Sequence, residues 1–115
     1  MTARRLLEQD PSLLSERDLA TLVADTARLA GWKRYHTFDS RRSNHGFPDE
    51  VLARGDRLLF AELKSEQGKL RPEQAEWLEA LSGIETVEAH LWRPSDWDAI
   101  VHVLTGRAFA RGDAC

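Results

Sequence analysis

Residues 46–64 read GFPDEVLARGDRLLFAELK, in which two short apolar runs flank the polar sequence RGDR. A two-residue loop that begins with glycine is typical of a type II′ β-hairpin. If Gly55 and Asp56 form this loop, Arg54 pairs with Arg57 across it. The sequence therefore predicts a hairpin whose tight turn sets the register of both of its strands.

Counting outward from this turn places Asp49 directly opposite Glu62, with Lys64 on the same face of the sheet. Directly opposed carboxylates about 4.5 Å apart repel by roughly 4 kcal/mol at an effective dielectric constant near 20. Either a positive charge lies between them, or one of them keeps its proton. Lys64 is one candidate for that charge. A divalent cation is the other, because carboxylate oxygens suit hard ions such as Mg²⁺.

The residues around the two acids resemble a known nuclease motif. Pro48 and Asp49, followed by Glu62, Leu63 and Lys64, are similar to the PD-(D/E)XK motif. The blocks GFPD, ELK, GKL and PEQ, in this order, resemble the VRR-NUC (virus-type replication-repair nuclease) branch of that superfamily.

The resemblance covers residues 15–104 and implies a fold. It implies an α/β domain of the restriction-endonuclease type, with an αβββαβ core. A central mixed four-stranded sheet would be flanked by helices, with an extra helix at the C-terminus. Residues 106–115 are expected to form a frayed tail.

The resemblance also implies an activity: Mg²⁺- or Mn²⁺-dependent cleavage of DNA, on branched or structured substrates such as flaps and Holliday junctions, in replication, recombination or repair. Asp49 and Glu62 would bind the ion together with the carbonyl of Leu63, and Lys64 would orient the attacking water. Glu16 is implied as a third carboxylate, although an acid in the first turn of a helix is also favoured by the helix dipole. The alternative function is a non-cleaving DNA-binding module of a larger replication or restriction assembly.

Candidate DNA contacts lie on both sides of the acids. Residues 33–71 carry 9 basic and 6 acidic side chains, although the whole chain has a net charge of −3. The candidates are Arg41, Arg42, Ser43, His45, Lys69 and Gln74. A polar loop is equally consistent with simple solvation, and Gln74 also fits the third position of a helix, where a glutamine can cap. His36 and His45 are interpreted as hydrogen-bonded or exposed histidines rather than as metal ligands.

A helix is predicted to begin at Ser15, which together with Asp18 resembles a capping box. The segment before it, residues 1–12, is expected to be a lead-in, because a proline at position 11 disfavours helix at Asp10. The helix should end at Gly31. Its expected inner face consists of Leu19, Leu22, Val23, Thr26, Leu29 and Ala30.

The remaining elements follow from hydrophobic periodicity and from residues that typically begin or end helices. Strands are predicted at residues 32–39 and 86–92. Pro72 suits the first position of a helix that ends at Gly83, and Ser95 with Asp98 would open the last helix. The inner stripe expected for the helix after Pro72 is Ala75, Leu78 and Leu81.

The two hairpin strands carry apolar residues on both faces, so a sheet covered on both sides is expected. Glu50 is the exception in this pattern. Since the resembling family prefers an apolar residue there, Glu50 is expected near a sheet edge or at the mouth of the cleft.

Length and composition limit the remaining possibilities. A chain of 115 residues forms one domain with a modest core. Its only cysteine is Cys115, so neither an internal disulfide framework nor a cysteine-based zinc site is expected. No apolar run reaches the length of a membrane span, and we expect a cytoplasmic protein without a nucleotide cofactor. A homodimer would suit symmetric cleavage of a junction, but no residue pattern establishes one.

Overall fold

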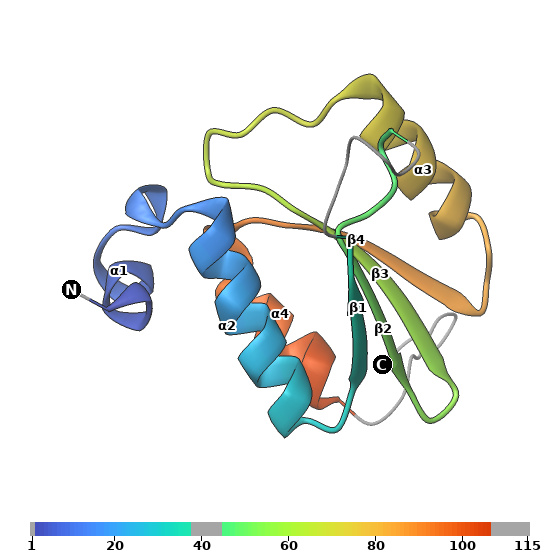
Figure 1. Cartoon of the computed structure of the whole chain (residues 1–115), viewed down its shortest axis with the longest axis horizontal. Helices are drawn as coiled ribbons and strands as arrows, with labels where there is room; N and C mark the ends of the chain where they lie inside the picture. Colours follow the sequence, from blue (N-terminus) through green and yellow to red (C-terminus); the bar gives the residue numbers. More distant parts are fainter. Residues whose placement is uncertain (1, 38–44, 107–115) are drawn as a thin grey trace.

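A mixed four-stranded sheet with the strand order β1-β2-β3-β4 forms the centre of the protein (Figure 1). This computed structural model describes residues 2–37 and 45–106. The first three strands are antiparallel, whereas β4 lies parallel to β3. The strands are β1 (Lys33–His36), β2 (Glu50–Arg54), β3 (Arg57–Leu63) and β4 (Val87–Trp92). The predicted αβββαβ order with an additional C-terminal helix is confirmed.

The turn between β2 and β3 is the one that the sequence predicts. Arg54 pairs with Arg57 across it, and Gly55 has a φ of +59°. A type I′ turn would need a positive φ at Asp56 as well, which the structure does not show. The observed backbone therefore agrees with a type II′ turn.

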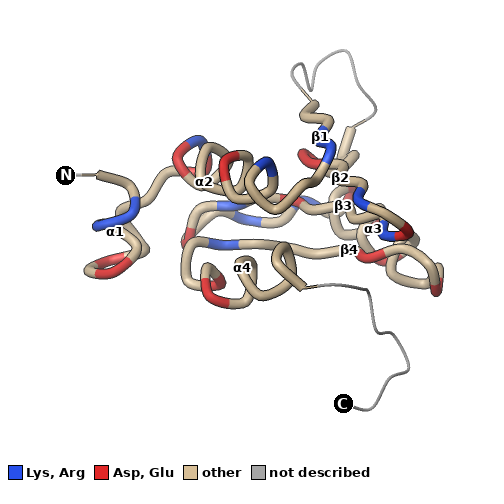
Figure 2. The backbone as a smooth tube through the Cα atoms, turned by 90° about the horizontal axis from the view of Figure 1, so that it is seen from below, with Lys and Arg blue, Asp and Glu red and all other residues tan. Residues whose placement is uncertain are grey.

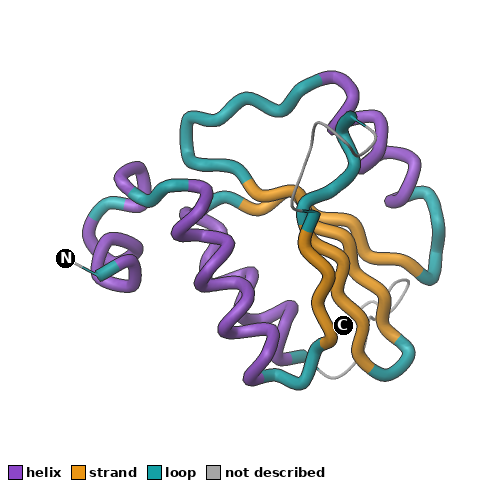
Figure 3. The backbone as a smooth tube through the Cα atoms, in the orientation of Figure 1, coloured by secondary structure: helices purple, strands orange, loops and turns teal. Residues whose placement is uncertain are grey.

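Helices cover the two faces of the sheet unequally (Figures 1 and 3). On one face, α2 (Glu16–Leu29) and α4 (Trp97–Thr105) pack together over the core. On the other face, α3 (Pro72–Ser82) packs against β4 and, to a lesser extent, β3. Tyr35 on β1 is 63% exposed. The expected cover on both faces is thus complete on one face and only partial on the other.

The main core lies between the sheet and the two helices α2 and α4. Its members are Leu14, Leu19, Val23, Ala27, Trp32, Leu52, Leu59, Ala61, Leu63, Trp92, Ile100 and Leu104. Within the described ranges, none of the helices is long and apolar enough to pass through a bilayer.

The N-terminal lead-in contains a helix, contrary to the expectation for residues 1–12. Helix α1 (Ala3–Gln9) begins after Thr2, whose side chain accepts a hydrogen bond from the backbone N–H of Arg5 (3.3 Å). Asp10 ends the helix, and a 3-10 helix (Pro11–Leu13) follows. The proline therefore terminates a helix that has already formed rather than preventing it.

Two residues expected on inner helix faces are exposed. Leu29 is 80% exposed, and Ala27 is fully buried in its place. The buried face of α2 runs through Leu19, Val23 and Ala27 at a spacing of four residues, and Leu29 lies two residues past it, about 200° around the helix. Ala75 on α3 is likewise exposed.

The last helix begins one residue later than predicted, with Asp96 and not Ser95 at its N-cap position. A 3-10 turn (Pro94–Asp96) comes first, and α4 starts at Trp97. The carboxylate of Asp96 accepts a hydrogen bond from the backbone N–H of Arg93 (2.9 Å) at the start of this 3-10 turn, and it makes no cap bond to α4.

The predicted cap of α2 gives a direct test. Oγ of Ser15 accepts a hydrogen bond from the backbone N–H of Asp18 (3.0 Å). We expect Ser15→Ala to lower the free energy of unfolding by about 1 kcal/mol, because one N–H at the start of the helix loses its acceptor. Urea denaturation measures this change. Ser95→Ala is the matched control and should change stability by less than about 0.5 kcal/mol; equal losses would contradict the assignment of both caps.

Candidate active site

Asp49 and Glu62 meet at the open end of the hairpin. The last pair of the ladder joins Glu50 to Ala61, so the next pair outward is Asp49 with Glu62, as predicted. Oδ2 of Asp49 accepts a hydrogen bond from the backbone N–H of Leu63 (3.0 Å), which holds this carboxylate against β3. Asp49 is half-buried, whereas Glu62 is only 1% exposed.

The burial of Glu62 makes its charge costly. Burial, followed by a hydrogen bond with Asp49 and the negative charge of Asp49, raises the pKa of Glu62 to about 9. When Glu62 is ionised, its Oε1 atom has no hydrogen-bond partner among residues 2–37 and 45–106. A buried polar atom in this state costs about 1–3 kcal/mol, so the pair of acids calls for a further positive group.

Gln74 both caps α3 and contacts Glu62. Its Oε1 accepts a hydrogen bond from the backbone N–H of Arg71 (2.9 Å), which completes the first turn of α3. Its Nε2 donates to Oε2 of Glu62 (2.9 Å). Capping and contact with the site therefore occur together, and one amide orients the buried acid. The predicted contact of Gln74 with DNA stays a prediction.

Lys64 lies beside the acids without forming an ion pair with them. Its side chain is 9% exposed. In the described part of the chain, no ion pair within 4 Å joins it to Asp49, Glu62 or Glu16. Its positive charge nevertheless opposes the rise in the pKa of Glu16 and of Glu62. A closed network of Lys64 with the two acids is thus not what the structure forms.

The GFPD block holds Asp49 in place through an aromatic cluster. The ring of Phe47 meets Phe60 of β3 edge-on at 6.0 Å and Trp77 of α3 at 5.1 Å between centroids. Pro48 is fully buried directly before Asp49. This packing joins the segment before β2 to both β3 and α3. Trp77 acts here as a packing residue.

Gly46 allows this segment to approach α3 closely. Its φ is +87°, and a Cβ atom at this position would lie 2.5 Å from the backbone of Glu73. We expect Gly46→Ala to lower the free energy of unfolding by at least about 1–2 kcal/mol, through the left-handed backbone and the clash. Chemical denaturation measures it. Gly83→Ala is the control, because Gly83 has a negative φ and space for a Cβ; similar losses would contradict this reading.

A cavity of about 370 Å³ opens between α2 and Asp49. Its lining residues are Glu16, Arg17, Ala20, His36, Asp49 and Leu63. Burial, together with the charge of Asp49, raises the pKa of Glu16 above its ordinary value, whereas Lys64 lowers it. Glu16 therefore faces the site from α2. However, residues 2–37 and 45–106 contain no group of three His, Cys, Asp or Glu residues that could hold a metal ion.

Glu50 lies neither at a sheet edge nor at the mouth of the cleft, so that expectation is wrong. It is fully buried on the inner strand β2. Nη2 of Arg34 donates to Oε2 of Glu50 (2.9 Å), Nε of Arg34 binds the other oxygen, and Nδ1 of His36 also contacts the carboxylate. Buried charges are costly unless paired, and these two partners on β1 explain why an acid is tolerated there. The hydrogen bond of His36 confirms the interpretation given to this histidine.

The site lies within a chain whose family can be established. The family model of the VRR-NUC domain matches residues 3–91, about three quarters of the chain. The chain belongs to the VRR-NUC family. This is a family of nuclease type, which implies DNA as the class of substrate. The match on this VRR-NUC chain begins in α1 and ends in β4. It therefore starts earlier and ends earlier than the resemblance seen in the sequence, which covers residues 15–104. No curated protein and no solved structure matches the chain significantly.

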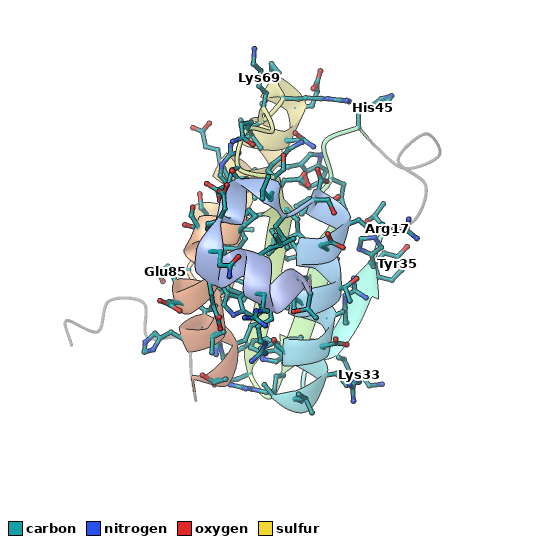
Figure 4. All side chains as sticks on the ribbon, turned by 90° about the vertical axis from the view of Figure 1, so that its left-hand side faces the viewer. Arg17, Lys33, Tyr35, His45, Lys69 and Glu85 are labelled. Carbon is teal, nitrogen blue, oxygen red and sulfur yellow. The ribbon has the colours of Figure 1, made fainter. Side chains whose placement is uncertain are left out.

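The predicted DNA contacts of this VRR-NUC protein fall into two groups. His45 and Lys69 are exposed and lie toward the same end of the molecule (Figure 4). Arg41, Arg42 and Ser43 lie outside the described residues. Basic and acidic residues are interspersed along the helices and strands (Figure 2). The roles of all these residues stay predictions.

Proposed function

We propose that this VRR-NUC protein is a metal-dependent endonuclease that hydrolyses phosphodiester bonds in DNA, with branched or structured DNA such as flaps and four-way junctions as its substrate. One observation supports this proposal most strongly. Two opposed acids at one site, Asp49 and Glu62, share a buried position in which one oxygen has no donor. Lys64 lies within electrostatic reach of them and forms no ion pair with either.

The donor set fits a hard divalent cation. The carboxylates of Asp49 and Glu62, with the carbonyl of Leu63, would supply the oxygen ligands that Mg²⁺ and Mn²⁺ prefer. Such an ion would keep Glu62 ionised at neutral pH and give its free oxygen a partner. Two carboxylates suffice, because Mg²⁺ usually keeps several waters. Glu16 would act on these waters from α2, which agrees with its place on the cavity wall.

The residues of the chain divide the remaining work. When bound, the ion neutralises a phosphate oxygen and lowers the pKa of water. Lys64, a compact point charge on a flexible stem, would orient the attacking water and favour its hydroxide form for in-line attack on phosphorus. The N–H of Leu63 holds Asp49 in position, and the amide of Gln74 does the same for Glu62. His45 and Lys69, with Arg41, Arg42 and Ser43, would bind DNA phosphates.

A cleavage panel tests this proposal. Labelled single-stranded, duplex, flap and four-way-junction DNA are incubated with the protein in Mg²⁺, in Mn²⁺ and in a chelator. We expect cleavage of the flap or the junction with either ion and none with the chelator. DNA binding without cleavage under all conditions would contradict the nuclease proposal and indicate the non-cleaving DNA-binding module. Sedimentation of the junction complex would show whether a homodimer binds it.

A further inference from the structure

The chain that follows Lys64 folds back over the lysine side chain. A Cβ atom built on Gly68 would lie 3.4 Å from Cδ of Lys64 and 3.1 Å from Oγ of Ser65. The backbone N–H of Gly68 donates to the carbonyl of Ser65 (3.2 Å), which closes a turn over residues 65–68. The turn therefore lies against the aliphatic stem of Lys64, a residue that is only 9% exposed.

Arg93 holds this turn through its backbone. A single nitrogen, Nη1, donates to the carbonyl oxygens of Ser65 (2.7 Å), Glu66 (3.1 Å) and Gly68 (2.7 Å). Arg93 follows β4 directly and lies beyond the end of the family match. Three carbonyls that point at one cation replace the carboxylate that a half-buried arginine usually needs. In the described ranges, Arg93 forms no ion pair within 4 Å.

Two further hydrogen bonds join the same two segments. The backbone N–H of Lys64 donates to the carbonyl of Trp92 (3.0 Å), at the end of β4. Oε1 of Glu66 accepts from the backbone N–H of Ser95 (2.6 Å). The chain after β4 therefore fixes both the backbone of Lys64 and the turn above its side chain. Arg93 supplies three of these contacts and is the only side chain among them that carries a positive charge.

We propose that Arg93 is a positioning residue for Lys64: it clamps the turn at residues 65–68 and so sets where the lysine ammonium group lies relative to the two acids. This inference rests on the proposed nuclease function, in which Lys64 touches the attacking water. Three hydrogen bonds already commit Nη1 of Arg93 to backbone carbonyls of the protein. Loss of Arg93 should therefore lower kcat by about 10- to 100-fold, the effect expected for a small misplacement, and leave KM nearly unchanged.

Lysine acetylation followed by mass spectrometry tests the clamp without any need for cleavage. In the wild type, acetic anhydride should label the buried Lys64 far more slowly than the exposed Lys33. In Arg93→Ala, labelling of Lys64 should rise about tenfold or more, with labelling of Lys33 and cooperative unfolding unchanged. A folded Arg93→Ala that protects Lys64 as well as the wild type does would overturn the inference.

Arg93→Lys provides a second variant in case Arg93→Ala does not fold. An ammonium group has three donors on one nitrogen, which matches three convergent carbonyls, but the lysine chain is shorter. We expect both the protection of Lys64 and kcat of Arg93→Lys to lie between those of wild type and Arg93→Ala. Two results would contradict the clamp. In one, Lys64 of Arg93→Lys reacts as fast as it does in the unfolded protein; in the other, Lys64 is fully protected but activity is lost.

Kinetics on the cleaved substrate complete the test. Arg28→Ala is the matched control, because Arg28 is exposed on α2 and, among the residues that the structure describes, its ion pairing is limited to a 4.0 Å contact with Asp25. The kcat of this variant should equal that of wild type. A rise in KM without a change in kcat for Arg93→Ala would show a DNA contact and overturn the inference. Lack of cleavage by the wild type would contradict the proposed function alone, since the acetylation result decides the clamp separately.

Discussion

Replacing Glu62 with glutamine is expected to lower the rate of DNA cleavage by at least about 10³-fold, equivalent to about 4 kcal/mol of transition-state stabilisation. The amide keeps the size of the side chain but offers no negative charge to a cation. Because Glu62 is buried and faces Asp49, it has no direct path to the DNA backbone. DNA affinity should therefore change by less than about threefold, or about 0.7 kcal/mol.

The same exchange at an exposed position provides the control. Glu76 lies on the solvent side of α3, and Glu76→Gln should cleave like the wild type. Cleavage of the labelled flap and junction in Mg²⁺ is measured for both variants, with affinity measured separately by fluorescence anisotropy. If Glu62→Gln cuts DNA at the wild-type rate, the assignment of this site is wrong.

The metal-free wild type is expected to lose stability as pH rises between about pH 5 and pH 8, where Glu62 contributes up to about 1.4 kcal/mol for each pH unit. In the unfolded chain, Glu62 ionises near its ordinary pKa of 4.5, whereas in the folded protein its pKa is about 9. Between these values the unfolded state binds fewer protons than the folded state, so a rise in pH favours unfolding. The amide of Glu62→Gln does not titrate, so the variant should gain stability relative to the wild type as pH rises.

Urea denaturation of both proteins in a chelator, at several pH values in this window, measures the difference. Glu88 does not interfere: burial raises its pKa, but the neighbouring His90 and Arg57 lower that pKa by more, so its contribution to stability is lost only below about pH 4.5. A difference that stays constant with pH would contradict the raised pKa of Glu62. At pH 8, Mn²⁺ should stabilise the wild type and not the variant.

The part of the site that the sequence predicts is the part fixed by local chemistry. Gly55 selects one turn type, the turn sets the register, and alternation of side chains then brings Asp49, Glu62 and Lys64 to one face. The cap at Ser15 is equally local, because its partner lies three residues away. The contact of Gln74 with Glu62 could not be predicted from local sequence, since it joins α3 to β3.

The features that the sequence misses depend on contacts between distant segments. Arg57 and Glu88 form a buried ion pair at 2.6 Å, although they are 31 residues apart, and it joins β3 to β4. The partners of Glu50 lie on β1, and only the register of β1 against β2 shows that Arg34 and His36 face this acid. The available signal in the sequence is that Arg34 and His36 are two residues apart, which places them on the same face of a strand.

Arg93 and α1 were missed for a related reason. A cation that binds backbone carbonyls leaves no acidic partner in the sequence to search for. Helix α1 is short and has no buried residue, so its hydrophobic pattern is weak, and it packs against α2 and the 3-10 helix that follows it. In both cases the tertiary neighbours, and not the local sequence, decide the structure.

The most direct test of the central claim is the position of a bound ion. Crystals of the protein soaked in Mn²⁺ give an anomalous difference map in which manganese stands out from all lighter atoms. The account predicts a peak in contact with carboxylate oxygens of both Asp49 and Glu62, and no such peak in crystals of Glu62→Gln. A strong peak elsewhere, with the space between these two acids empty, would contradict it.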